Sequence, residues 1–141
     1  MKSIILVAGL FAGSLMAQVP TDWTELGEVR YMRGVDLRTG YMVEKPRFSG
    51  KIKRIADQEI EISGYMLPLD AEGKTYALSK YPYAACFFCG GGGLESVMNI
   101  WFRELDQRYS VDEYVKLRGT LRLNDNGDGL IYLLEGAEEV E

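Results

Sequence analysis

The stretch DEYVKLRGTLRL, residues 112–123, is the clearest strand in the chain and carries Gly119 near its centre. Apolar and polar side chains alternate along it, which is typical of a strand that buries one face. A glycine inside such a pattern indicates a bulge or a close approach of another backbone. We therefore expect a long, coiled β-strand at this point.

A second stretch, QEIEISGYMLPLD at residues 58–70, repeats this pattern around Gly64. The alternation changes phase at the glycine, which predicts a bulge or a barrel corner. Turn residues punctuate the rest of the chain, and they separate three further predicted strands, at 75–79, 96–103 and 130–134.

Five strands with little helix predict a mostly β fold. A small five-stranded OB-like barrel is favoured, because closure removes exposed strand edges and the internal glycines let long strands coil. A small β-sandwich is the alternative. The barrel is expected at 58–136, after an irregular N-terminal arm at 18–57 and before an acidic tail at 137–141 without predicted structure.

The pattern in the N-terminal arm is weak. One or two helical turns are expected from Thr21 or Asp22, and Trp23 is expected to tie the arm to the core. Gly34, Gly40 and Pro46 then predict an irregular segment.

The first 17 residues have the features of a secretory signal peptide. A positive Lys2 precedes an apolar run too short to span a bilayer, and small residues lead to Ala17. Cleavage near Ala17 predicts a periplasmic or secreted protein with no membrane span in the mature chain.

Composition restricts the function classes. The 141 residues carry a net charge of −5, which argues against nucleic acid as a partner because phosphates attract Lys and Arg. The chain has no histidine. This excludes Ser/His/Asp and Cys/His nucleophilic pairs, haem attachment through CxxCH and His-containing zinc sites.

Both cysteines, Cys86 and Cys89, lie in the stretch YPYAACFFCGGGGLE at residues 81–95. Aromatic side chains, consecutive glycines and two thiols gather there, so we expect this loop to bind the ligand. Its candidate ligand-binding residues are Tyr81, Tyr83, Phe87, Phe88, Gly90, Gly91 and Glu95.

The cysteine pair has three interpretations. An oxidising compartment favours a disulfide. Two thiolates also suit a soft metal, copper or zinc, although further ligands would then be needed. Thiol–disulfide exchange is the third, but no Lys or Arg lies between Lys80 and Arg103 to activate a thiol. The additional metal ligands considered are Met66, Met98, Glu95 and Asp70, or groups from a second chain.

Three segments carry a family resemblance: GYMLPLD at 64–70, YPYAACFFCGG at 81–91 and RGTLRLN at 118–124. Their order resembles an uncharacterised family of small exported bacterial proteins that is known only as a domain of unknown function. In related sequences a histidine and prolines follow the cysteine, whereas here Phe87, Phe88 and Cys89 follow Cys86. If that family has a metal site, Cys86 matches its cysteine and Cys89 stands in place of the histidine. The resemblance implies an OB-like barrel and export. It does not bring an established activity with it.

We therefore expect an exported β-barrel binding module rather than an enzyme, with a small molecule, metal ion or protein as its partner. A thiol–disulfide oxidoreductase and a purely structural interaction module are the alternatives.

Overall fold

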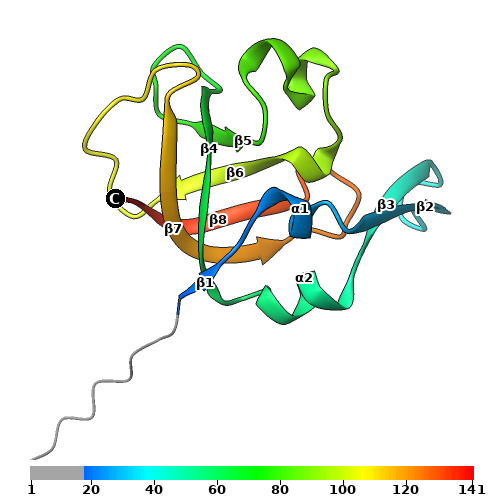
Figure 1. Ribbon diagram of the computed structural model, residues 1–141. Coiled ribbons are helices and arrows are strands. Elements are labelled where there is room, and N and C mark those ends of the chain that lie inside the picture. Colours follow the sequence, from blue (N-terminus) through cyan, green and yellow to red (C-terminus); the bar gives the residue numbers. More distant parts are fainter. Residues whose placement is uncertain (1–17) are drawn as a thin grey trace, which may run out of the picture.

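The computed structural model describes residues 18–141, so the expected signal peptide lies outside the described residues. Five strands form a closed ring in the order β4-β5-β6-β8-β7, and β7 pairs again with β4 (Figure 1). This confirms the mostly β fold with a small five-stranded barrel, and not the alternative sandwich. The barrel strands are β4 (Glu59–Pro68), β5 (Tyr76–Ser79), β6 (Val97–Phe102), β7 (Tyr114–Leu123) and β8 (Tyr132–Val140).

The connectivity of the ring is more complex than a simple meander. Strands β4, β5 and β6 follow one another in antiparallel pairs, but β8 inserts between β6 and β7. Strand β8 is parallel to β6 and antiparallel to β7. An inserted strand of this kind is a feature of Greek-key barrels, the group to which the OB fold belongs.

Gly64 lies where β4 changes partners. Strand β4 pairs with β7 up to Tyr65 and with β5 from Tyr65 onward. A Cβ on Gly64 would lie 2.6 Å from the Ser79 carbonyl oxygen, so only glycine lets the strands approach this closely.

The predicted phase change at Gly64 is wrong. Ile60, Ile62, Gly64 and Met66 are all buried, and the register with β7 runs through the glycine without a shift. The misleading signal came from Leu67, which is also buried but belongs to a second cluster outside the barrel core. The irregularity lies in β8 instead, where the registers with β6 and β7 both shift at Gly136, opposite Gly119 of β7.

The barrel interior holds the main core, and a separate small cluster is packed under the cysteine loop. The phenol of Tyr132, from β8, donates a hydrogen bond of 2.7 Å to the Leu26 carbonyl and joins the barrel to the N-terminal segment. The core is built from large apolar side chains that include Ile60, Ile62, Met66, Tyr76, Leu78, Met98, Leu117, Leu121, Tyr132 and Leu134. The small cluster comprises Leu67, Ala77, Cys86 and Val97.

The N-terminal segment begins with β1 (Val19–Pro20), parallel to β4, followed by the single turn of α1 (Trp23–Leu26). Asp22 caps α1 by accepting a hydrogen bond of 2.9 Å from the Glu25 amide. The Trp23 indole donates a 2.8 Å bond to the Ser63 carbonyl and is buried in the core. The expected helical turn and the expected role of Trp23 are both confirmed.

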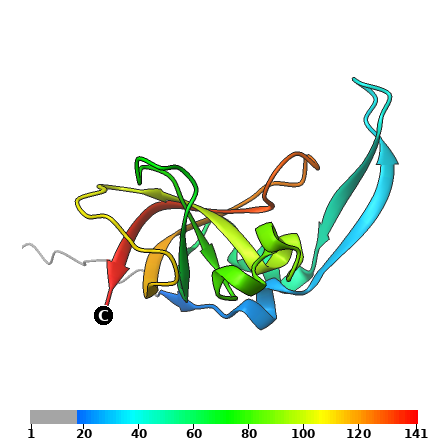
Figure 2. The same ribbon diagram turned by 90° about the horizontal axis from the view of Figure 1, so that it is seen from above.

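The segment expected to be irregular is in fact a β-hairpin. Strands β2 (Val29–Val35) and β3 (Met42–Phe48) pair in continuous antiparallel register, and Figure 2 shows them projecting from the barrel. Gly40 occupies the turn with a φ of +75°. The prediction failed because most side chains on both faces of the hairpin are exposed, so the sequence shows no apolar alternation.

Helix α2 (Gly50–Ile55) returns the chain from the hairpin to the barrel. Ser49 caps it, and Ile52 and Ile55 face the core. Among residues 18–141, no helix is long and apolar enough to cross a bilayer.

The expected structureless acidic tail at 137–141 is also wrong, because β8 continues to Val140. Glu138 accepts a 2.7 Å bond from the Arg118 guanidinium of β7, and Ala137 pairs with Phe102 of β6. The arginine on the neighbouring strand therefore neutralises the glutamate charge, which in the sequence alone argues against a strand.

Candidate functional site

Short 3₁₀ turns shape the cysteine loop between β5 and β6. In the second of them, η2 (Phe87–Cys89), the amides of Cys89 and Gly91 both donate to the Cys86 carbonyl, at 3.1 and 2.9 Å. This turn places the two Sγ atoms 3.9 Å apart. The two thiols are therefore close together, as the sequence predicts, and no disulfide joins them.

The two thiols occupy different environments. Cys86 is fully buried in the small cluster with Leu67, Ala77 and Val97, whereas Cys89 is exposed. Loss of solvation in the turn and the neighbouring Cys86 thiol raise the pKa of Cys89, and a bond from Tyr83 only partly opposes this. A thiol with a raised pKa is protonated at neutral pH and is a weak nucleophile.

The glycines that follow set the backbone path of the loop. Gly90 ends η2 in the left-handed region, with a φ of +80°. A Cβ on Gly91 would overlap the Ala85 carbonyl group. These glycines act through conformation, because each occupies a position that a side chain would strain or block.

An apolar groove lies beside the cysteine turn, between the end of β4 and the loop that connects β6 to β7. Its volume is about 300 Å³. The aromatic rings of Tyr83 and Phe88 form one wall and are 55% and 49% exposed. The apolar groove is lined by Leu67, Pro68, Leu69, Tyr83, Phe88 and Val111.

Asp112 holds the two walls of the groove together. Its carboxylate accepts a 2.7 Å bond from the Tyr83 amide, and its own amide donates to the Met66 carbonyl of β4. Asp112 has a φ of +65°, a conformation that Asp tolerates better than most residues with a side chain. Asp112, in a strained backbone position, therefore ties the cysteine loop to the end of β4.

The remaining predicted ligand-binding residues divide into two groups. Phe87 packs edge-on against Phe88 and on the small cluster, so it supports the groove wall. Tyr81 and Glu95 do not line the groove. The Lys80 ammonium lies 5.2 Å from the centre of the Tyr81 ring, and Glu95 accepts a 2.9 Å bond from the Tyr31 phenol of the hairpin.

None of the additional metal ligands considered from the sequence faces the thiols. Met66 and Met98 are buried in the barrel core, on the opposite side of their strands from the cluster that contains Cys86. Bonds from Thr75 and the Lys74 amide lower the pKa of Asp70 to about 2, and these bonds hold its carboxylate in the β4–β5 turn. In residues 18–141, no group of three or more His, Cys, Asp or Glu is placed to hold a metal.

Sequence reasoning missed four groove residues: Leu67, Pro68, Leu69 and Val111. Leu69 directly follows β4 and Val111 lies in the β6–β7 loop, and nothing in the sequence around either residue marks it as part of a site. Their meeting depends on the closure of the barrel, which brings the end of β4 beside the β6–β7 loop.

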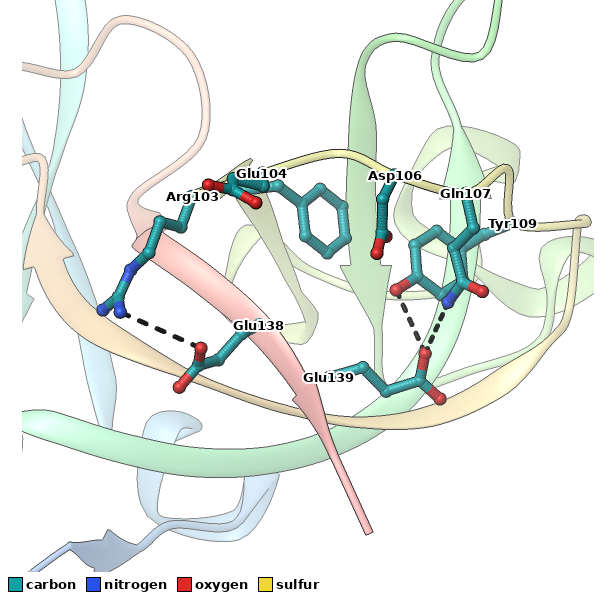
Figure 3. A pocket seen from close by; sticks show the side chains of 8 residues that line it. Arg103, Glu104, Asp106, Gln107, Tyr109, Glu138 and Glu139 are labelled. Atoms are coloured by element: carbon teal, nitrogen blue, oxygen red, sulfur yellow. Dashed lines mark hydrogen bonds and ion pairs between the residues drawn. The ribbon is translucent and has the colours of Figure 1, made fainter.

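A second, polar pocket of about 390 Å³ lies between the β6–β7 loop and the end of β8 (Figure 3). Glu139 accepts bonds from Gln107 and Tyr109, at 2.8 and 3.1 Å, and Glu138 faces Arg103. Tyr109 stacks on Phe102 at its base, with centroids 5.3 Å apart. Two of the four carboxylates that line this acidic pocket, those of Glu138 and Glu139, are thus bonded to neighbouring side chains.

Comparison with known proteins identifies a fold relative. No family model matches the chain, and no curated protein matches it. A crystal structure of a DUF3299 family protein from Pseudomonas aeruginosa aligns with a TM-score of 0.55 over 89% of this chain and 97% of that one, at 13% identity. The two proteins share a fold, and the relative belongs to a domain-of-unknown-function family of the kind that the sequence motifs resemble.

Proposed function

We propose that this protein is an exported binding module that holds a small apolar ligand in the groove beside the cysteine turn. One observation carries the proposal: six apolar side chains from three separate segments line a single concave surface, and Tyr83 and Phe88 remain about half exposed there. Concave apolar sites with aromatic walls are typical of ligand-binding proteins.

The chemistry of the groove supports an uncharged, apolar ligand. No charged side chain lines it, and its volume of about 300 Å³ is at the lower end of the range for small-molecule sites. A single aromatic ring or a short acyl chain is of the right size. The overall charge of −5 makes an anionic ligand such as a nucleotide unfavourable.

Binding fits this site better than catalysis. The raised pKa of Cys89 leaves its thiol protonated, and Cys86 is buried, so neither sulfur is an activated nucleophile. The polar groups closest to the groove have structural roles, as the bond from the Tyr83 amide to Asp112 illustrates.

Two further parts of the proposal are export and family membership. The signal-peptide pattern of residues 1–17 supports a periplasmic or secreted location. The shared fold, together with the motifs at 64–70, 81–91 and 118–124, supports membership of the DUF3299 family.

The test is a titration of purified protein with N-phenyl-1-naphthylamine, an uncharged dye whose fluorescence rises in apolar sites. Phe88→Ser and Val111→Ser remove one side chain from each wall of the groove, and each is expected to weaken dye binding at least about tenfold, since each takes away roughly 1.5–3 kcal/mol of apolar contact. Trp101→Ser is the matched control, because Trp101 is exposed on β6 outside the groove. Equal binding by all four proteins would refute the proposal.

The cysteine pair supports a second candidate function, the binding of a soft metal ion. Tetrahedral zinc with Zn–S bonds of about 2.3 Å places two sulfurs roughly 3.8 Å apart, close to the 3.9 Å between Cys86 and Cys89. Thiolates would hold copper or zinc, and the remaining positions would be left to water or a second molecule.

Metal analysis of reduced protein distinguishes this candidate from the first. Zinc or copper bound at one ion per chain, and lost in Cys86→Ser/Cys89→Ser, would support it, and dye binding should be unchanged in that variant. Disulfide formation remains the alternative for this pair. A redox potential below about −300 mV without exchange activity would make such a bond structural and would remove the oxidoreductase interpretation.

A further inference from the structure

The β2–β3 hairpin, residues 29–48, differs from the rest of the molecule in charge. It carries five basic and two acidic residues, a net charge of +3. The other residues from 18 to 141 carry ten basic and nineteen acidic residues, a net charge of −9. A basic element therefore projects from an acidic body; Figure 2 shows the projection of the hairpin.

Apolar side chains are concentrated at the far end of the hairpin. Leu37, in the turn, is 97% exposed. Val35 and Met42 form the last pair of the ladder, and Tyr41 follows the turn. We call Val35, Leu37, Tyr41 and Met42 the hairpin tip, and all four are more than half exposed.

Basic side chains lie behind the tip, on the shank of the hairpin. Arg30 pairs directly with Arg47 across the two strands, and Lys45 is next to Arg47 on that face. Like charges at directly opposed positions are destabilising. No ion pair among the described residues joins these three side chains to a carboxylate, since the pair within the hairpin is Arg33–Glu44 on its other face.

The base of the hairpin is held against the barrel, so its direction is defined. The Tyr31 phenol donates to Glu95, and the Ser49 amide donates to the Glu28 carbonyl where the two strands meet the body. Burial and the Glu95 carboxylate raise the pKa of Tyr31, so this phenol stays protonated and keeps donating at neutral pH. An isolated two-stranded sheet is marginally stable in water, and a partner surface would stabilise the free end.

We propose that this hairpin docks on the surface of an anionic lipid bilayer. The tip enters the interface between headgroups and acyl chains, and Arg30, Lys45 and Arg47 contact the phosphates. The order of the residues along the hairpin, apolar at the end and basic behind it, matches the order of the layers in a bilayer. The acidic body is repelled by the same surface, which leaves the hairpin as the point of contact.

The other occupant with a suitable charge is a second copy of this chain, through its acidic pocket. That pocket is lined mainly by charged and polar side chains, so it offers little to cover Leu37 or Met42. An anionic bilayer offers apolar chains for the hairpin tip and phosphates for the basic side chains behind it.

The experiment is co-sedimentation of the full protein with vesicles of phosphatidylcholine and phosphatidylglycerol, or of phosphatidylcholine alone. Binding is expected only to the anionic vesicles and should decline with added salt. Each basic side chain near such a surface contributes about fivefold, so Arg30→Gln/Arg47→Gln should bind roughly 25-fold more weakly. Leu37→Ser/Met42→Ser should lose at least about tenfold.

Lys74→Gln and Trp101→Ser are the controls for charge and for apolar surface, since both side chains are exposed on the barrel. All variants share the same N-terminal residues, so a difference between them reports on the hairpin alone. The proposal is overturned if the hairpin variants sediment like the unaltered protein. It is also overturned if the protein self-associates without vesicles and Leu37→Ser abolishes that association.

Discussion

Replacing each cysteine by serine should have unequal effects on stability, although the two residues are three positions apart. Cys86 is fully buried among Leu67, Ala77 and Val97, and Cys89 is exposed. A serine at position 86 places a hydroxyl in an apolar cluster, which costs about 1–3 kcal/mol by comparison with other proteins. A serine at position 89 stays in contact with water, and its effect should lie within about 0.5 kcal/mol.

These values apply to reduced, metal-free protein. Oxidation to a disulfide would close a ring of four residues. For a ring of that size the loss of chain entropy in the unfolded state is roughly 6 cal/mol/K, which stabilises the folded protein by about 2 kcal/mol at 25 °C. Both serine variants would lose this contribution equally, so oxidation should add the same amount to each.

The assay is urea unfolding followed by tryptophan fluorescence, with and without a reductant. With a slope of roughly 1–3 kcal/mol per M, a change of 2 kcal/mol moves the midpoint by about 1 M, which is easily measured. Cys86→Ala is the matched control, because it removes the sulfur without burying a hydroxyl, and it should lose less stability than Cys86→Ser. Equal losses for Cys86→Ser and Cys89→Ser under reductant would refute the reasoning, because they would show that the two thiols act as one unit.

Three other predictions test the support of the site and the barrel. Asp112→Ala should lower the unfolding free energy by about 1–3 kcal/mol, because it removes the acceptor for the Tyr83 amide and leaves alanine at a positive φ; an unchanged thermal midpoint would contradict this. Gly64→Ala should cost at least about 1–3 kcal/mol by overpacking against β5, while Gly34→Ala, with no atom within 4 Å of the added Cβ, should change little; equal chemical-denaturation midpoints would exclude the close approach. Asp70 has its pKa lowered to about 2 in the fold, so its ionised form stabilises the protein above the unfolded value of 3.8 and this contribution is lost as pH falls through about 2; acid titration of Asp70→Asn should lack this step, and an identical acid profile would argue against it.

The barrel strands β4 and β7 were predictable because burial alternates along each of them. Period-two alternation identified β4, β6 and β7, and the turn before it identified β5, with errors of a few residues at their ends. The same rule failed at the hairpin, where neither face is buried, and at the end of β8, where glutamates are paired with arginines of the neighbouring strand β7. Ion pairs between two strands produce no recognisable pattern in the sequence of either strand.

The candidate site was predicted in part. The spacing of Cys86 and Cys89 was enough to place their sulfurs together, because a single turn spans them. The aromatic wall of the groove, Tyr83 and Phe88, was also identified. The opposite wall was not, because Leu69 and Val111 are far apart in sequence and are ordinary apolar residues at the ends of elements.

The sequence by itself determined what depends on neighbouring residues: the strand pattern, the need for glycine in two long strands, the turn that joins the thiols and the absence of histidine chemistry. Only the tertiary structure decided which of those features meet. Packing of the cysteine loop on β4, β5 and β6, outside the barrel core, buries Cys86 but leaves Cys89 exposed. Closure of the barrel places Met66 and Met98 in the core, away from the thiols, and brings the end of β4 beside the β6–β7 loop to form the groove. The physical reason is that burial and contact arise between segments distant in the chain, whereas periodicity and turn geometry act within a few residues.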